Sequence, residues 1–261
     1  MNPSVTIDIQ DNGVASVCLN RPEKHNAFDD SIIAELSDSF KNLAQDPRVK
    51  LVILRSNGKS FSAGADLNWM KRMANYGHED NLKDARSLAD MLHNLYTMPQ
   101  PTIALIQGAA FGGAVGLASC CDIALASTKA SFSLSEVKIG LIPATISPYV
   151  IEAIGARAAR RYFQTGERFS AERAMSLGLV SEVCAAEYLD AELDTLVNTL
   201  LNNGPTAMAE AKRLVADFAH QTITPSLIED SCERIAHIRV SPEGQEGLAA
   251  FLEKRPANWK E

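Results

Sequence analysis

The first half of the chain alternates between stretches with the apolar spacing of strands and stretches with that of helices. "VTIDIQ" and "VASVCLN" alternate apolar and polar residues on either side of an Asn-Gly turn at residues 11–13, which predicts a β-hairpin. Apolar residues then recur every three or four positions from Ile32 to Leu43, and Asp29 or Asp30 supplies a polar cap for that helix. The chain is therefore expected to open with a hairpin and an amphipathic helix.

Continuous apolar runs at residues 50–56 and 102–108 each predict a strand buried on both faces. Helical spacing at Leu88, Leu92 and Leu95 lies between them, and "GGAVGLASCC" predicts a short helix of small side chains before a further strand, "DIALA". Strands and helices that alternate in this way form mainly parallel sheets covered by helices. The predicted fold class is α/β.

Beyond about residue 170 the pattern becomes helical. "SAERAMSLGLV" begins at a Ser cap, and "TAMAEAKRLVADFA" carries an apolar side. "TPSLIEDSCERIAHI" and "SPEGQEGLAAFLEK" each start with Thr or Ser followed by Pro, as helix N-termini do. We divide the chain into a core at residues 1–200 and a helical region at residues 201–261, which is expected to pack against a neighbouring subunit.

Composition narrows the classes of function. The formal net charge of −7 at pH 7 disfavours nucleic-acid binding, which needs an excess of Lys and Arg. No apolar run approaches the ~20 residues of a membrane span, and the N-terminus lacks the features of a signal peptide. The five cysteines have no zinc-ligand spacing, so we expect free thiols, a cytoplasmic protein and no metal site.

Common catalytic motifs are missing from the sequence. No GxGxxG follows the first strand, and GxxxxGK[ST], HExxH and GxSxG are absent. The five histidines form no ligand spacing either. Metal-dependent and nicotinamide-dependent reactions are therefore poor candidates.

Two loops of small residues have the composition of an oxyanion hole. Gly112 and Gly113 follow a buried strand and open a helix, whose N-terminus exposes unpaired N–H groups and the positive end of its dipole. "SAGADL" at residues 62–67 is a second loop of this kind after a strand. One N–H from each loop could hold a carbonyl oxygen that becomes negative during reaction. Tight packing between strand and helix is the alternative interpretation.

Glu136 is the candidate acid/base. It follows the glycine corner among partly apolar neighbours, where a carboxyl has a raised pKa and exchanges protons near neutrality. A surface glutamate at the end of a strand is the alternative. Pro143 then stands near the start of a helix, which leaves the N–H of Ala144 as a donor to water or substrate.

Taken together, these stretches resemble the crotonase family, the enoyl-CoA hydratase/isomerase superfamily. The resemblance runs essentially end to end and rests on "LNRPEKHNAF", "FSAGADL", "IQGAAFGGAVGLASCCDIALA", "SEVKIGLIP", "ERFSAERAMSLGLVSEV" and "EGQEGLAAFLEKRPANWK". It implies a crotonase-like spiral of ββα units, a helical C-terminal trimerisation region, and homo-trimers or hexamers. It also implies an acyl-CoA thioester as substrate, with coenzyme A as part of that substrate and no further cofactor or metal.

The resemblance also implies roles for individual residues. Ala65 and Gly113 would donate their backbone N–H groups to the thioester oxygen, and Glu136 would transfer the proton. Lys24 and Ala27 would line the CoA arm, and Lys254 would approach its adenine or phosphate end, often from a neighbouring subunit. The further substrate-binding positions are Ala63, Asp66, Leu67, Gly112, Gly116 and Ala144.

This chain departs from the family pattern at two places. Gly116 stands where ordinary hydratases carry the first of two glutamates, and "ATISPYV" at residues 144–150 replaces a Gly-rich stretch. Both departures resemble bacterial methylglutaconyl-CoA hydratases of leucine breakdown, and relatives that act on longer carboxylated isoprenoid-CoA esters. We expect Gly116 to make room for the branch of such a substrate. Its tertiary β-carbon tolerates positive charge, so that Glu136 alone could serve as acid and base.

The predicted function is that of a lyase that adds water to a branched, carboxylated enoyl-CoA such as 3-methylglutaconyl-CoA, or removes it. One glutamate also suffices for an isomerase that moves the double bond, and decarboxylation of a carboxylated acyl-CoA is a third possibility. A non-catalytic acyl-CoA binder would explain Gly116 but not the retention of Glu136 and both oxyanion positions.

Overall fold

The computed structural model describes residues 3–260, which form two compact units. One unit comprises the chain up to Met98 together with Thr102–Leu193, and the other comprises Pro99–Pro101 and the chain from Asp194 onward. Helix α7 (Leu189–Leu201) contains both this division and the division after residue 200 that we predict from the sequence.

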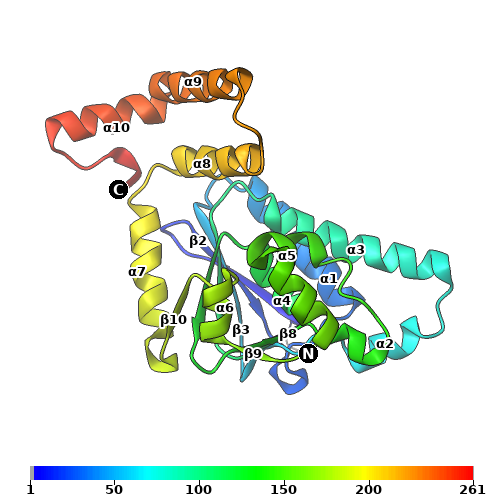
Figure 1. Ribbon diagram of the computed structural model, residues 1–261. Helices are drawn as coiled ribbons and strands as arrows, with labels where there is room; N and C mark the ends of the chain where they lie inside the picture. The colour runs from blue at the N-terminus through cyan, green and yellow to red at the C-terminus, as the bar shows by residue number, and fades with distance from the viewer. Residues whose placement is uncertain (1–2, 261) are drawn as a thin grey trace. The chain divides into compact units, whose positions relative to one another are not determined.

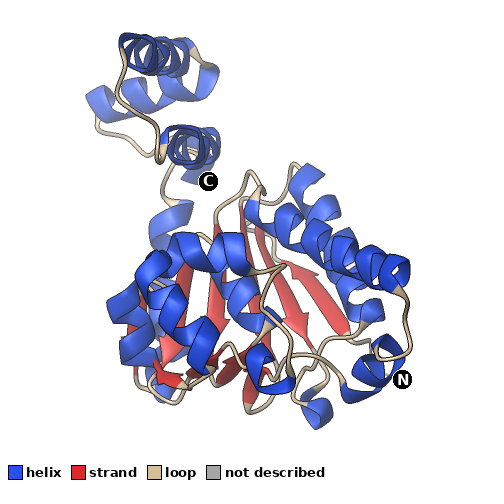
Figure 2. Ribbon diagram, turned by 45° about the vertical axis from the view of Figure 1, so that its right-hand side comes forward, coloured by secondary structure: helices blue, strands red, loops and turns tan. Residues whose placement is uncertain are grey.

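The first unit is built around a six-stranded sheet with the strand order β1-β2-β3-β5-β7-β10. β1 and β2 form the predicted hairpin and pair antiparallel, whereas all other neighbours in this sheet pair in parallel. Helices cover the sheet, which is red in Figure 2. The strands are β1 Val5–Ile9, β2 Val14–Leu19, β3 Leu51–Ser56, β5 Thr102–Ile106, β7 Ile123–Ser127 and β10 Glu182–Cys184.

A second sheet contains four short strands in the order β4-β6-β8-β9, of which only β8 and β9 pair antiparallel. They are β4 Ser60–Ser62, β6 Ala109–Phe111, β8 Ser131–Ser133 and β9 Phe169–Ser170. Consecutive strands alternate between the two sheets, so that β3 leads to β4, β5 to β6 and β7 to β8. Because helices follow each of these pairs, the predicted spiral of ββα units is confirmed.

The helices of this unit pack around its strands (Figure 1). They are α1 Asp30–Gln45, α2 Leu67–Met73, α3 His78–Tyr96, α4 Gly113–Cys120, α5 Ser147–Thr165 and α6 Ala171–Leu177, with 3-10 turns at Pro22–Lys24, Glu136–Ile139 and Ala186–Tyr188. Of the two predicted caps for α1, Asp29 is the one used, since its carboxylate accepts the N–H of Ile32 at 3.0 Å. The apolar stripe of α1 is buried in the core, as its spacing predicts.

The second unit is helical and contains α8 (Pro205–Phe218), α9 (Pro225–Val240), α10 (Pro242–Glu253) and a 3-10 turn at Asn258–Lys260. Thr224 and Ser241 cap α9 and α10, as predicted from the Thr-Pro and Ser-Pro pairs. α8 is capped from a distance, because the Glu243 carboxylate at the start of α10 accepts the N–H groups of Thr206 and Ala207 at 2.9 and 2.7 Å. None of the helices described for residues 3–260 is both long and apolar enough to cross a membrane.

Candidate active site

The glycine corner joins β6 to α4 and exposes an N–H group. Gly112 has a φ of 54°, a left-handed conformation that favours glycine, and its own N–H donates to the carbonyl of Ser133 at 2.9 Å. Gly113 is the first residue of α4, and its N–H has no acceptor within residues 3–260. This is the position at which a helix leaves its N–H groups unpaired. The Gly113 N–H is therefore available to a ligand.

The loop after β4 presents Ala65 in the same way. Ala63, Ala65 and Leu67 are exposed, whereas Gly64 and Asp66 between them are buried. Phe28 binds the buried side of the loop: its N–H donates to the Gly64 carbonyl at 2.7 Å and its carbonyl accepts the Asp66 N–H at 2.6 Å. Because peptide groups alternate in direction along extended chain, the N–H of Ala65 faces away from Phe28. It too has no acceptor in the part of the chain that is described.

The loop and the corner lie next to each other. β4 and β6, which lead into them, are parallel neighbours. A Cβ placed on Gly64 would lie 3.4 Å from the carbonyl oxygen of Phe111, the residue before the corner. A Cβ placed on Gly113 would lie 3.3 Å from the ring of Phe28, which also holds the Ala65 loop. The fold thus brings together the two segments that the sequence suggests as amide donors.

Glu136 reaches the same corner from the first position of the 3-10 turn that follows β8. A Cβ placed on Gly112 would lie 3.2 Å from its Oε1. Its Oε2 is buried and has no hydrogen-bond partner among the described residues. Removal from water raises the pKa of this carboxyl above the ordinary glutamate value. An unpaired carboxyl with a raised pKa, beside the corner that carries the unpaired Gly113 N–H, is suited to proton transfer next to a polarised carbonyl.

The space expected at Gly116 is filled. A Cβ placed on Gly116 would lie 2.4 Å from Cγ2 and 2.9 Å from Cβ of Ile146, with Leu92 Cδ2 at 3.5 Å. Ile146, which belongs to "ATISPYV", is 3% exposed. The prediction that Gly116 makes room for a substrate branch is therefore wrong, because the side chain of Ile146 occupies that volume. The two departures from the family pattern, Gly116 and "ATISPYV", are thus linked, because the Ile146 side chain packs against Gly116.

The expected role of Ala144 also needs correction. Its N–H donates to the carbonyl of Ile142 at 2.8 Å, so it is not free to bind water or substrate. The cause is that α5 begins only at Ser147, with Ile146 as its N-cap. Ala144 lies in the turn before the helix rather than in its first turn.

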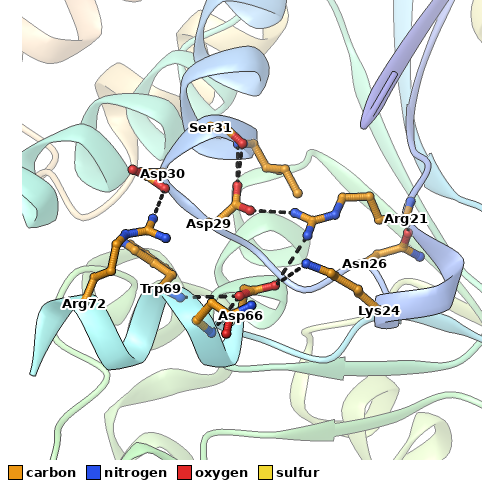
Figure 3. Close-up of polar contacts among 11 residues, drawn as sticks. Arg21, Lys24, Asn26, Asp29, Asp30, Ser31, Asp66, Trp69 and Arg72 are labelled. Atoms are coloured by element: carbon orange, nitrogen blue, oxygen red, sulfur yellow. Dashed lines mark hydrogen bonds and ion pairs between the residues drawn. The ribbon is translucent and has the colours of Figure 1, made fainter. Parts of the chain in front are cut away.

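The Asp66 carboxylate forms hydrogen bonds and ion pairs with neighbouring residues (Figure 3). Its Oδ1 accepts the N–H groups of Asn68 and Trp69 and so caps α2, and its Oδ2 lies 3.4 Å from Arg21 and 3.3 Å from Lys24. The residue is 6% exposed. Desolvation acts to raise its pKa, but the Asn68 N–H, the Lys24 ammonium group and the Trp69 N–H outweigh it, so that the pKa lies below the usual value. Asp66 thus anchors the loop that carries Ala65.

We expect Asp66→Ala to lower the free energy of unfolding by about 2 kcal/mol, of which about 1 is the lost cap and the rest the lost ion pairs. Asp66→Asn keeps the cap and should cost about half as much. Because the folded-state pKa is depressed, the ion-pair contribution is present above the unfolded pKa of about 3.9 and is lost as pH falls through the folded value. Urea unfolding at pH 7 measures the free-energy loss of each variant, and urea unfolding in acid measures how much of the ion-pair contribution disappears. Equal losses for Ala and Asn at pH 7 would show that the cap contributes nothing.

Of the other predicted positions, Lys24, Ala27 and Leu67 adjoin Phe28 or Asp66 in the first unit, whereas Lys254 belongs to the second unit. Ala27 is buried, Leu67 is 73% exposed, and the ammonium group of Lys24 pairs with Asp66. Lys254 is the exposed C-cap of α10 in the second unit. Within residues 3–260 no three His, Cys, Asp or Glu side chains are grouped so that they could hold a metal ion. No local sequence pattern marks Phe28 and Ile146, because their roles depend on contacts between distant segments.

Comparison with known proteins gives one consistent result. Residues 9–261 match the family described as enoyl-CoA hydratase/isomerase. The mitochondrial enoyl-CoA hydratase of Pongo abelii is 34% identical over 256 residues, which cover 97% of this chain and 85% of that protein.

Solved structures show the same similarity. An enoyl-CoA hydratase from Shewanella pealeana has a TM-score of 0.95 at 47% identity, covering 98% of this chain and 96% of that one. An enoyl-CoA hydratase from Mycobacterium smegmatis has a TM-score of 0.93 at 32% identity, with all of both chains covered.

Proposed function

The chain belongs to the enoyl-CoA hydratase/isomerase family, and on that premise we propose that it adds water to a branched, carboxylated enoyl-CoA such as 3-methylglutaconyl-CoA, or removes it. It is an enoyl-CoA hydratase-type enzyme, and its substrate is an acyl-CoA thioester. The observation that carries the proposed chemistry is the buried, unpaired carboxyl oxygen of Glu136 beside the Gly112–Gly113 corner.

In the proposed reaction, the thioester oxygen accepts hydrogen bonds from the N–H groups of Ala65 and Gly113. Water oxygen bonds to the β-carbon while the electrons of the double bond move onto that thioester oxygen, where the two amides stabilise the negative charge. Glu136 takes a proton from the water and delivers it to the α-carbon as the carbonyl forms again. One water is added in full, and Glu136 returns to its carboxylate form.

The proposed substrate follows from the number of catalytic carboxyl groups that the enzyme provides. With Gly116 and Ile146 in place of a second acid, one group must both activate the water and protonate the carbon. A tertiary β-carbon supports more positive charge during water addition, which lowers the demand on that single group. The sequence "SEVKIGLIPATISPYV" also resembles methylglutaconyl-CoA hydratases. These features favour a branched substrate of leucine or isoprenoid breakdown.

Incubation with 3-methylglutaconyl-CoA in water labelled with heavy oxygen tests the proposal. We expect one labelled oxygen in the product and a higher kcat/KM than for crotonyl-CoA. Exchange of carbon-bound hydrogen in heavy water without oxygen incorporation would instead identify an isomerase, which the single glutamate also suits. Release of carbon dioxide would identify a decarboxylase, and no reaction despite tight binding would identify a non-catalytic acyl-CoA binder.

We further propose that the second unit mediates assembly into homo-trimers or hexamers. Its helices and connections expose large apolar side chains, among them Val215 (67%), Ile223 (80%), Val240 (72%), Phe251 (81%) and Leu252 (76%). Exposed apolar surface of this extent is typical of a protein interface. In such an assembly Lys254 could approach the CoA of a neighbouring subunit. Light scattering of the purified protein measures the oligomeric state directly.

A further inference from the structure

Phe28 contacts both segments that carry the candidate amide donors. Its main chain forms two hydrogen bonds with the Ala65 loop, through the Gly64 carbonyl at 2.7 Å and the Asp66 N–H at 2.6 Å. Its ring lies against Gly113, where an added Cβ would be 3.3 Å from both Cδ2 and Cε2. The residue is 3% exposed. One side chain and its backbone thus lie between the donors of two different ββα units.

The hydrogen bonds that join the two segments end before the candidate amide donors. Pairing between β4 and β6 ends at Ser62 and Ala110, and its register is irregular. Beyond these strands, no hydrogen bond within the described chain joins residues 64–66 to residues 112–114. The separation of the Ala65 and Gly113 N–H groups therefore depends on what is packed between the segments.

Phe28 itself is held firmly. Asn26, two residues earlier, is 1% exposed, and its side-chain amide donates to the carbonyls of Asn57 and Ser60 at 2.8 and 2.9 Å. Asp29, directly after Phe28, caps α1 and pairs with Arg21 at 2.6 Å. Contacts on both sides hold the backbone of Phe28, and its ring is buried between the two segments.

We propose that Phe28 is a positioning residue that sets the distance between the Ala65 and Gly113 amides and thereby the polarisation of the thioester carbonyl. The inference rests on the proposed oxyanion site. An aromatic ring is rigid, so it holds the Ala65 loop and the Gly113 corner at a fixed separation. A flexible side chain of similar volume would let these two segments shift relative to each other. Oxyanion stabilisation depends on donors held at short distance from the charged oxygen, so a small shift lowers the rate without preventing substrate binding.

The test compares Phe28→Leu and Phe28→Met with Phe40→Leu. Phe40 is an equally buried phenylalanine in the middle of α1, so its variant controls for the loss of a core ring. Phe28→Met keeps most of the volume and should fold even if Phe28→Leu does not. The probes are butyryl-CoA with an isotopically labelled carbonyl, and S-butyl-CoA, a thioether without the oxygen.

For the Phe28 variants we expect kcat to fall by about 10- to 100-fold. The infrared carbonyl band of bound butyryl-CoA should move back toward its solution frequency, while the affinity for S-butyl-CoA changes less than about twofold. Phe40→Leu should lower the melting temperature but leave kcat and the band unchanged. Phe28 variants that keep both kcat and the band shift would overturn the inference. If the wild-type enzyme itself leaves the band at its solution frequency, the proposed oxyanion site fails, and the inference with it.

Discussion

Glu136→Gln is expected to reduce kcat by about 10³-fold or more while the affinity for acyl-CoA stays within a few-fold, because the side chain's shape remains and only its ability to exchange a proton is lost. The carboxyl lies against Gly112, and its Oε2 has no hydrogen-bond partner among the described residues, so no second side chain shares its proton. Glu35→Gln, which changes an exposed glutamate on α1, is the matched control and should keep full activity. Turnover near the wild-type rate in the Glu136 variant would rule out a single-glutamate mechanism.

The same substitution should make the protein more stable at neutral pH. Burial raises the pKa of Glu136 in the folded state above the value of about 4.3 in the unfolded chain. Ionisation therefore favours the unfolded state as pH rises from that value through the folded pKa. The melting temperature of Glu136→Gln should exceed that of the wild type at pH 7, and the difference should vanish below the unfolded pKa. Since the carboxylate is the form that accepts a proton from water, activity should fall as pH drops through the raised pKa.

Gly116→Glu is expected to destabilise the protein by at least about 3 kcal/mol rather than restore a two-glutamate site. Any side chain at this position meets Ile146, whose Cγ2 would lie 2.4 Å from the new Cβ, and the nearest atoms all belong to the apolar side chains of Ile146 and Leu92. Urea unfolding of the Gly116→Glu variant measures the loss in the free energy of unfolding.

Ile146→Gly supplies the comparison for this prediction. Alone it removes a buried side chain and should cost about 2–5 kcal/mol. In the double variant the new glutamate can occupy the vacated volume, so the combined loss should be smaller than the sum by about 1–3 kcal/mol. Strictly additive losses would mean that residues 116 and 146 do not share one volume.

The sequence predicts the parts of the fold whose signals are local. The hairpin at residues 11–13, the stripe of α1 and the Thr-Pro and Ser-Pro caps are each encoded within a few neighbouring residues, and all are present. The strands of the second sheet were not predicted, because segments of two or three residues are too short to show a period. The strand predicted at 102–108 extends two residues beyond the end of β5 at Ile106, and the short β6 begins at Ala109.

In the candidate site, too, the sequence predicts what local motifs encode and not what depends on contacts between distant segments. The family motifs locate Ala65, Gly113 and Glu136, and the fold brings the loop and the glycine corner together, with Glu136 against that corner. What no local pattern encodes is which distant side chain fills a space. The absence of a side chain at Gly116 does not reveal Ile146, 30 residues later (146 − 116), and Phe28 gives no sign that its ring will lie against Gly113. Pro143 predicts a helix start that would leave the Ala144 N–H free, but α5 begins only at Ser147, and this N–H is bound to the carbonyl of Ile142.

The cap that Glu243 provides for α8 has a consequence for synthesis on the ribosome. Gly204 offers no side-chain cap of its own, and the carboxylate that replaces it comes 37 residues after Thr206. A nascent chain that has emerged only as far as α9 still exposes the bare N-terminus of α8. We therefore expect the C-terminal helices to become ordered together and late, after α10 has left the exit tunnel, while the ββα spiral already has all its strands.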